Sequence, residues 1–333
     1  MPEAPEVRKY ADLLAKALVG KRITAFSART KQAKAWLSAN EPALIGLKIE
    51  QVFARGKNIV GVIEDDFYFY SHQMMWGRWE IHSGTEELAK DRRERARITA
   101  DGVTAILMSA PVFEIGRGDP LKTVPYLKSL GPDVLTYGEV FNAAEFRKRL
   151  LKRRNKTRTL GDVLLDQQIA AGIGNYLRAE IMFLAKLNPW MAVKELSTAD
   201  IDLLCDLIPR VCNQAYTENG TTVTPKLKKR MKTDETLVYV PGKEYGTRHY
   251  VFRRTNLPCL ICATPVKQLR QTVTPADAPP IVSVAPSLKV ERKGKTTEIA
   301  DKEPRDEDEE KSRIVYFCPS CQGVEVSLYA RKR

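Results

Sequence analysis

Residues 160–180 read LGDVLLDQQIAAGIGNYLRAE. Apolar residues recur at helical spacing on both sides of a short glycine-containing segment, which predicts one helix over 160–170 and a second over 175–185. Gly172 and Gly174 allow a tight turn between the two helices. Asn175 stands at the expected N-cap of the second helix, where free backbone N–H groups would bind a phosphate. A helical hairpin that simply packs in a core explains the same stretch equally well.

Basic residues lead directly into this hairpin. Residues 147–158 (RKRLLKRRNKTR) hold eight Lys or Arg in twelve positions, and residues 226–232 (KLKKRMK) hold five in seven. The whole chain of 333 residues has 54 Lys and Arg against 41 Asp and Glu, a net charge of +13. A single charge run is as often a solvated face as a binding site, but two runs with this excess favour phosphate contacts and a polyanionic partner.

The pattern differs on the two sides of the Gly131-Pro132-Asp133 turn. Residues 5–18 read as a helix that has Pro5 at its first position and stops near Gly20. Residues 21–115 read mostly as strands, including 58–63 with 67–71 and 97–100 with 104–109. Helices follow at 143–151 and 199–217 as well as in the hairpin. We therefore predict an α+β multidomain chain, with an N-terminal helix and an antiparallel β-sandwich or barrel ahead of an all-α domain.

Four of the six cysteines form two Cys-x2-Cys pairs near the C-terminal end. Four thiolates in this pattern, from Cys259, Cys262, Cys318 and Cys321, predict one structural Zn²⁺. The alternatives are four unrelated thiols or two disulfides, whereas Cys205 and Cys212 read as core thiols. We expect no organic cofactor.

The two cysteine pairs are unusually far apart for a compact zinc finger. Residues 271–311 lie between them and contain five Pro, no aromatic residue, ten acidic and seven basic residues. This composition predicts a disordered insert. Without the insert the two pairs are separated by 14 residues, a length that a β-hairpin spans.

The chain begins MPEAPEV. Removal of Met1 exposes the amine of Pro2, and α-amines have pKa values of about 7.7–8, so a useful fraction is unprotonated at neutral pH. A secondary amine that attacks a sugar aldehyde carbon forms a cationic iminium, and an adjacent Glu3 could move protons. An ordinary helix start is the alternative, and these seven residues alone favour it.

Other classes of protein are disfavoured. No apolar run is long enough for a membrane span, and charged residues interrupt the region where a signal peptide would need its apolar core. We expect a monomer without membrane contact, located in the cytoplasm or nucleoid if the source is prokaryotic.

Taken together, three motifs resemble the formamidopyrimidine-DNA glycosylase/endonuclease VIII family of base-excision repair enzymes. They are the N-terminal PE-x-PEV, the LLDQ-x3-AG-x-GNYL stretch ending at Leu177, and the C-terminal cysteine pairs, in the family's order. The endonuclease VIII branch is favoured by Tyr70-Ser71-His72 before Gly77-Arg78-Trp79, by Gly131-Pro132-Asp133-Val134-Leu135, and by Gly174-Asn175-Tyr176-Leu177-Arg178. The resemblance implies a catalytic β-sandwich domain over 2–135, a helix–two-turn–helix domain over 136–250, and a zinc-finger β-hairpin over 251–333 interrupted by the 271–311 insert.

The resemblance also implies roles for individual residues. Pro2 would attack C1′, Glu3 would protonate the deoxyribose ring oxygen, and Glu6 would orient them. Lys57 would act as a general acid and phosphate contact, and Asn175 and Arg313 would bind phosphates around a flipped nucleotide. Met74, Met75 and Trp76 would fill the hole left by that nucleotide, although strand and loop packing also explains them. His72 reads as a structural residue.

The function implied is a bifunctional DNA glycosylase/AP lyase that acts on damaged DNA. It would excise oxidised bases through a Schiff base on Pro2 and then cleave the strand by β- and δ-elimination. The resemblance to the endonuclease VIII branch favours oxidised pyrimidines as its substrates. The alternatives are a non-catalytic damaged-DNA-binding protein on the same scaffold and the same chemistry on oxidised purines.

Overall fold

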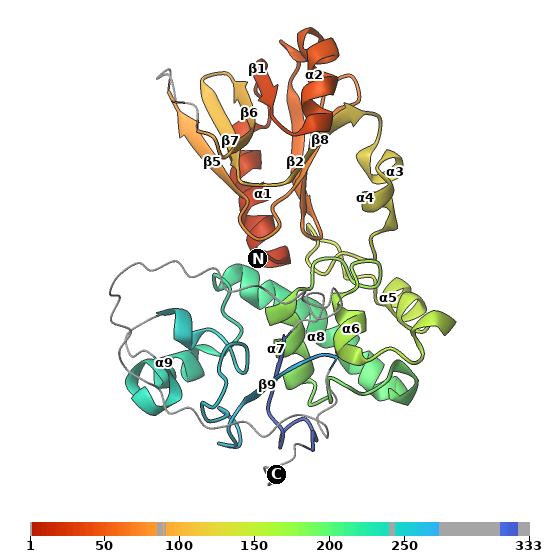
Figure 1. The fold of residues 1–333 in the computed structure, drawn as a ribbon, viewed down its shortest axis with the longest axis vertical. Coiled ribbons are helices and arrows are strands. Elements are labelled where there is room, and N and C mark those ends of the chain that lie inside the picture. Colours follow the sequence, from red (N-terminus) through yellow and green to blue (C-terminus); the bar gives the residue numbers. More distant parts are fainter. Residues whose placement is uncertain (1, 85–88, 90, 240–243, 273–313, 326–333) are drawn as a thin grey trace, which may run out of the picture.

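The computed structural model describes residues 2–84, 89, 91–239, 244–272 and 314–325. Two lobes stand one above the other, with the N-terminus close to their junction (Figure 1). The β-rich lobe comprises α1 (Ala4–Leu18), β1 (Ile23–Ala28), α2 (Lys31–Leu44), β2 (Ile49–Arg55), β3 (Asn58–Ile63), β4 (Phe67–His72), β5 (Arg78–Ser83), β6 (Glu94–Ala100), β7 (Val103–Met108) and β8 (Val112–Arg117).

These strands form two antiparallel four-stranded sheets, in the orders β1-β6-β7-β5 and β2-β3-β4-β8. The inner faces and the apolar side of α1 share one core, to which α1 contributes Val7, Ala11, Leu14 and Leu18. The β6–β7 turn has Asp101 and Gly102 at φ values of 38° and 74°, as a tight two-residue hairpin requires. The predicted antiparallel sandwich with an N-terminal helix is confirmed.

The second lobe is mostly helical. Its elements are α5 (Ala143–Leu150), η1 (Arg153–Asn155), α6 (Leu160–Leu165), α7 (Asn175–Leu184), η2 (Val193–Glu195), α8 (Thr198–Thr217), α9 (Pro225–Thr233), η3 (Glu235–Leu237), η4 (Glu244–Thr247), β9 (Lys267–Arg270) and β10 (Ile314–Phe317). Two short helices, α3 (Pro120–Thr123) and α4 (Pro125–Ser129), lie in the connection between the lobes (Figure 1), where Leu127 packs with Tyr68 and Tyr70 of β4.

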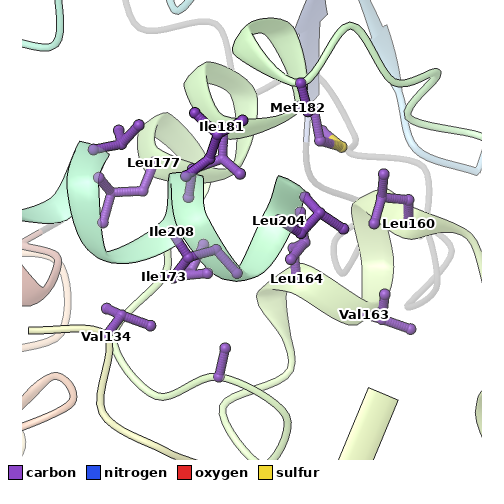
Figure 2. Packing of buried hydrophobic residues seen from close by; sticks show 14 of the residues in the cluster. Val134, Leu160, Val163, Leu164, Ile173, Leu177, Ile181, Met182, Leu204 and Ile208 are labelled. Atoms are coloured by element: carbon purple, nitrogen blue, oxygen red, sulfur yellow. The ribbon is translucent and has the colours of Figure 1, made fainter. Parts of the chain in front are cut away.

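The core of this lobe lies between α6, α7 and α8 (Figure 2). Leu164, Ile181 and Leu204 are fully buried there. Val315 and Phe317 of β10 enter the same cluster, so the β9–β10 hairpin packs against the helices. Ala4 and Val134 also belong to this cluster, so the two lobes pack against each other there. The domain boundary expected after residue 135 stays a prediction.

Several sequence predictions of secondary structure need correction. Residues 31–44 form a helix, not strand, and bury only Ala33, Leu37 and Leu44 on one face. The basic segment 226–232 lies on a helix, α9, that was not predicted. The first hairpin helix ends at Leu165 rather than at 170, because residues 166–173 form the turn. Among the described residues, no helix is both long and apolar enough to cross a membrane.

Candidate functional site

Glu3 lies at the junction of the lobes, immediately before α1. Its side chain is only 3% exposed. One carboxylate oxygen accepts the N–H of Gly174 at 2.7 Å and that of Leu177 at 3.2 Å, and the other accepts the N–H of Tyr176 at 2.9 Å. A Cβ at position 174 would lie 2.3 Å from the Glu3 carboxyl carbon, so this close approach requires glycine. A carboxylate from the β-rich lobe therefore caps a helix of the other lobe.

This arrangement corrects two predictions about the helical hairpin. The N-cap of α7 is Gly174, and Asn175 is the first residue of the helix. The backbone N–H groups expected to be free for a phosphate are largely occupied by Glu3. The turn itself is locked to the N-terminus, because the Ala4 N–H donates to the Gly172 carbonyl at 3.0 Å.

Glu6 lies one turn of α1 away from Glu3. It accepts the Glu3 N–H at 2.9 Å and the Tyr176 hydroxyl at 3.0 Å, so it links the start of α1 to α7. Burial raises the pKa of Glu6. Burial likewise raises the pKa of Glu3 to about 7, with the nearby Glu6 charge adding to the rise and the Lys57 charge and the helix N–H groups opposing it. A carboxyl group with this pKa holds a proton for part of the time at neutral pH and can act as an acid.

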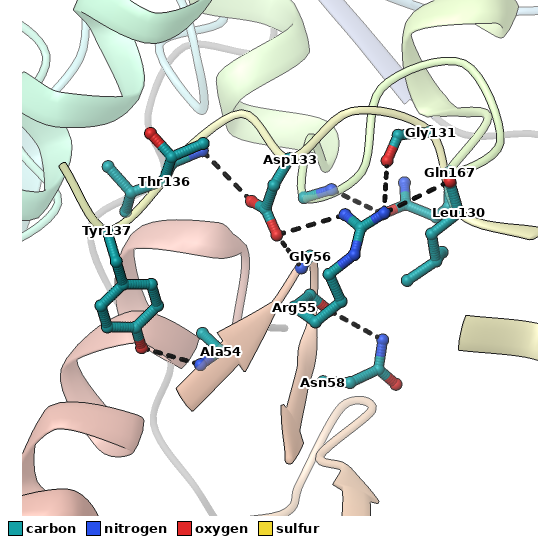
Figure 3. A network of polar contacts seen from close by, with 12 residues as sticks. Ala54, Arg55, Gly56, Asn58, Leu130, Gly131, Asp133, Thr136, Tyr137 and Gln167 are labelled. Atoms are coloured by element: carbon teal, nitrogen blue, oxygen red, sulfur yellow. Dashed lines mark hydrogen bonds and ion pairs between the residues drawn. The ribbon is translucent and has the colours of Figure 1, made fainter. Parts of the chain in front are cut away.

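Lys57 lies in the turn between β2 and β3 and is 7% exposed. Asp133, from the connection between the lobes, fixes this turn: its carboxylate accepts the Gly56 N–H at 2.6 Å and pairs with Arg55 at 3.4 Å (Figure 3). Arg55 also donates to the Gly131 carbonyl at 2.8 Å. The predicted lysine is thereby held where its charge acts on both Glu3 and His72.

Asn175 is held by the fully buried Arg178, which donates to its side-chain oxygen at 2.5 Å. Because this oxygen accepts from Arg178, the amide nitrogen remains as the donor of a side chain that lines the cavity described below, and a phosphate needs such a donor. Arg178 also donates to the Ile314 carbonyl at 3.0 Å, at the start of β10. Arg313, the predicted phosphate ligand, is the preceding residue and lies outside the described residues.

The prediction of disorder is wrong for Gln271, the first residue of the predicted insert. Gln271 is 6% exposed, contacts Arg178 at 3.3 Å, and accepts the Trp190 indole N–H on its carbonyl at 3.1 Å. It is therefore part of the folded body, because a buried polar side chain with these partners is packed rather than solvated. The prediction of disorder for 273–311 lies outside the described residues.

The loop between β4 and β5 carries three large apolar side chains in a row. Met74, Met75 and Trp76 are 44%, 54% and 78% exposed, which excludes their interpretation as strand core. Met74 has φ of 50°, and its N–H donates to His72 Nδ1 at 3.0 Å. Burial, and then the Lys57 charge, lower the pKa of His72 to about 4, so the ring is neutral and can accept this bond at neutral pH.

A cavity of about 350 Å³ is lined by four of the predicted site residues, Glu3, Glu6, Met75 and Asn175. The predicted residues Pro2, Lys57, Met74 and Trp76 are not among its lining residues. The remaining lining comes from residues that the sequence did not single out: Tyr176, Gly220, Arg248, His249, Phe252 and Arg253. The His249 ring lies 5.1 Å from Tyr176 and 5.3 Å from Phe252, so the wall is aromatic as well as basic. Stacking faces beside cations suit a planar base next to its phosphates.

A second, larger cavity of about 480 Å³ lies between β2 and residues 130–149. It contains none of the predicted site residues.

The four C-terminal cysteines converge. All their sulfur atoms lie within 4.8 Å of one another, and three of the pairs are 3.4, 3.4 and 3.9 Å apart. A tetrahedron with Zn–S bonds of about 2.3 Å has edges of about 3.8 Å. The Ile261 and Cys321 N–H groups donate to Cys259 and Cys318 sulfur at 3.5 Å, as suits thiolates. The donor set and its spacing fit a zinc ion.

Two family models match the chain. The formamidopyrimidine-DNA glycosylase N-terminal domain matches residues 1–109, and the formamidopyrimidine-DNA glycosylase H2TH domain matches residues 130–226. Endonuclease 8 of Escherichia coli O9:H4 (strain HS) is 32% identical over 270 residues, which are 80% of this chain and 94% of that protein. Endonuclease 8 of Pectobacterium carotovorum subsp. carotovorum (strain PC1) is 33% identical over 221 residues, 66% of this chain and 82% of that protein.

Solved structures show the same fold. The Lactococcus lactis Fpg in a complex with DNA containing an abasic site superposes with a TM-score of 0.67 at 22% identity, over 96% of this chain and 99% of that chain. A complex of the same protein with DNA containing N7-benzyl-Fapy-dG gives the same TM-score, identity and coverage.

Proposed function

The chain belongs to the formamidopyrimidine-DNA glycosylase family, in its endonuclease 8 branch, and is a DNA glycosylase/AP lyase of base-excision repair. We propose that it excises oxidised pyrimidines and that the amine of Pro2 is its nucleophile. The observation that carries this proposal is the position of Glu3. It is next to Pro2, buried, held by three N–H groups of the opposite lobe, and poised near pKa 7.

The proposed chemistry uses these two residues in sequence. The Pro2 nitrogen attacks C1′ while the N-glycosylic bond breaks. The base leaves with the electrons of that bond and takes up the proton that the attacking amine loses. Protonated Glu3 gives its proton to the deoxyribose ring oxygen, the ring opens, and C1′ forms an iminium ion with the amine. Loss of a C2′ proton then expels the 3′ phosphate oxygen, and a second proton loss expels the 5′ phosphate oxygen. Water finally hydrolyses the iminium and restores the amine.

The cavity supports a flipped-nucleotide geometry for this reaction. Extrusion of a base costs a few kcal/mol, which is least for a damaged base. The exposed Met75 and Trp76 could replace the lost stacking, and the Tyr176–His249–Phe252 wall could stack on the extruded base. Lys57, Asn175 and Arg313 would bind the flanking phosphates. This assignment is supported for Asn175 by its place in the cavity lining and by the Arg178 contact that leaves its amide nitrogen as a donor.

We also propose that one Zn²⁺ binds Cys259, Cys262, Cys318 and Cys321 and holds the hairpin that packs on the helical lobe. Metal analysis should find one zinc per chain. Cys259→Ser should lose the metal and weaken DNA binding, whereas Cys205→Ser, a thiol outside the cluster, should keep both. A zinc content equal in the two variants would contradict the assignment.

The substrate class is tested by nicking of a lesion panel. Mature protein that begins at Pro2 is incubated with duplexes containing 5-hydroxyuracil, thymine glycol, 8-oxoguanine or an abasic site. We expect faster cleavage at the two pyrimidines than at 8-oxoguanine, with phosphate at both ends of the gap, as β,δ-elimination requires. Preference for 8-oxoguanine would move the proposal to oxidised purines, and binding without any nicking would support the non-catalytic alternative.

A further inference from the structure

Four arginines gather at one end of the β-rich lobe, and none of them lines either cavity. They flank the end of β1 and the start of β6, and they form what we call the arginine rim: Arg29, Arg92, Arg93 and Arg95. The Arg29 N–H donates to the Arg95 carbonyl at 2.8 Å, and the Arg29 guanidinium donates to the Asp91 carbonyl at 2.8 Å. The rim is therefore fixed by the fold of the sheet.

The positive charge of the arginine rim is only partly compensated. Arg93 pairs with Asp91 at 2.6 Å. Within the part of the chain that the structure describes, Arg29, Arg92 and Arg95 have no carboxylate at ion-pair distance. Like charges held close together repel one another, and an anion that binds between them removes this repulsion. Because a guanidinium group can bind a phosphate with two hydrogen bonds, the rim fits a row of phosphates.

The arginine rim lies beside the Met74–Trp76 loop. The first residue of β5, which follows this loop, and the first residue of β6, which follows the rim, both pair with Met108 of β7. The N–H of Ser109, the next residue, donates to the Arg93 carbonyl at 2.8 Å. The loop therefore enters β5 next to the point where the rim enters β6.

The Met74–Trp76 loop separates the arginine rim from Lys57. The loop connects β4, in the sheet β2-β3-β4-β8, to β5, in the sheet β1-β6-β7-β5. Lys57 directly precedes β3, whose first residue, Asn58, pairs with His72 at the end of β4. Lys57 therefore stands at the β4 end of the loop, and the rim stands at its β5 end.

This placement distinguishes the two strands of a bound duplex. Side chains that replace a flipped nucleotide enter the base stack, so the two strands pass on opposite sides of the loop that carries them. Lys57, at the β4 end, is proposed above to bind phosphates of the strand that carries the lesion. The arginine rim, at the β5 end, then faces the complementary strand.

We propose that the arginine rim binds phosphates of the undamaged strand, a contact that single-stranded DNA cannot make. The proposal rests on the proposed function, because it takes the Met74–Trp76 loop and Lys57 as contacts of lesion-containing DNA. It extends that function to the second strand. Contacts of this kind carry no sequence information, but they fix the position and orientation of the duplex.

The double variant Arg92→Gln with Arg95→Gln tests the proposal, because it removes two uncompensated charges. Its binding to DNA with a tetrahydrofuran abasic analogue, which the enzyme cannot cleave, is measured over a salt series, as a duplex and as the same strand alone. For the duplex, the slope of log K against log salt should fall by about 1.8, and the affinity at 0.1 M salt by roughly 10- to 60-fold, since each phosphate contact contributes about 0.9 to the slope. The affinity for the single strand should stay within about twofold of the wild type.

Arg22→Gln with Arg117→Gln is the matched control. Both arginines are exposed, and they lie at the other end of the same lobe, because Arg22 precedes β1 and Arg117 ends β8 opposite the first residue of β4. This double variant removes the same charge and should leave the affinity for the duplex within about twofold of the wild type.

An equal loss of affinity for the duplex and the single strand, or an unchanged salt slope in folded protein, would overturn the role of the arginine rim. Thermal unfolding checks the fold, and Arg92→Gln alone, with an expected fall in slope of about 0.9, serves if the double variant does not fold. The binding measurement does not depend on cleavage. Failure of the wild type to nick any lesion or abasic duplex would therefore overturn the proposed function separately.

Discussion

Glu3 and Met75 line the same cavity, but the Glu3 carboxylate and the Met74–Trp76 loop that carries Met75 differ in their exposure and contacts. Glu3 is 3% exposed and accepts three backbone N–H groups from the other lobe. Trp76 is 78% exposed, and the two methionines before it are also exposed. The contacts of Glu3 form when the chain folds, whereas the exposed side chains of the loop leave apolar surface uncovered, which we propose is covered by DNA.

This difference separates two kinds of effect in variants. Polar groups that are fixed before the substrate binds need little reorganisation during the reaction, so their loss affects the chemical step. An exposed side chain contributes little to the folded state, so its loss affects the complex with DNA and leaves the stability of the protein almost unchanged. The predictions below test whether the two regions can be distinguished in this way.

The largest effect is expected for Glu3→Gln. The amide cannot donate a proton to the ring oxygen, so excision should fall by about 10²- to 10⁴-fold, the usual contribution of a general acid. Cleavage of preformed abasic DNA should fall less, because the ring at an abasic site opens without the enzyme. Single-turnover nicking of lesion and abasic duplexes measures both rates, and wild-type excision by this variant would refute the assigned role.

Trp76→Ala should act on the complex alone. Loss of one aromatic stacking contact costs about 1–3 kcal/mol, or roughly 5- to 150-fold in the excision rate. The thermal midpoint should stay within about 1 °C of the wild type, since the side chain is 78% exposed. A large drop in the midpoint together with unchanged excision would remove the distinction between the two regions.

The smallest effect is a pH dependence. Glu3 must be protonated to act as an acid, and its pKa is about 7, so excision should decline as the pH rises through this value. A single acid of this pKa predicts a loss of about fivefold between pH 7 and pH 8. Cleavage of abasic DNA measured in the same buffers is the reference.

Glu6→Gln sharpens this measurement. The negative charge of Glu6 helps to raise the pKa of Glu3, so its removal should move the decline in excision to lower pH. If the excision rate of this variant declines at the same pH as in the wild type, the group whose titration causes the decline is not Glu3.

The sequence predicted those helices and strands that are determined by residues close together in the chain. The hairpin across Asp101-Gly102 and the helix α1 depend on turn residues and on apolar spacing within a few positions. The helix α2 was missed because only Ala33, Leu37 and Leu44 mark its buried face. It also contains Pro42, a residue that is unfavourable inside a helix.

The site was predictable only where its residues carry recognisable motifs. Glu3, Asn175 and the four cysteines were singled out, but the occupation of the α7 N–H groups by Glu3 joins residues more than 170 positions apart and leaves no local pattern. The same holds for Arg248, His249 and Phe252, which line the cavity in a segment whose Tyr250, Val251 and Phe252 N–H groups are bound by the Glu180 carboxylate, about 70 positions earlier.

The central claim, attack by the Pro2 amine, has a direct measurement. Mature protein beginning at Pro2 is mixed with abasic-site duplex and borohydride, and the adduct is digested and sequenced by mass spectrometry. We predict one covalent adduct per chain with the sugar on the Pro2 nitrogen, and none from protein that retains Met1. Failure to trap an adduct, or an adduct located on a lysine such as Lys57, would contradict the account.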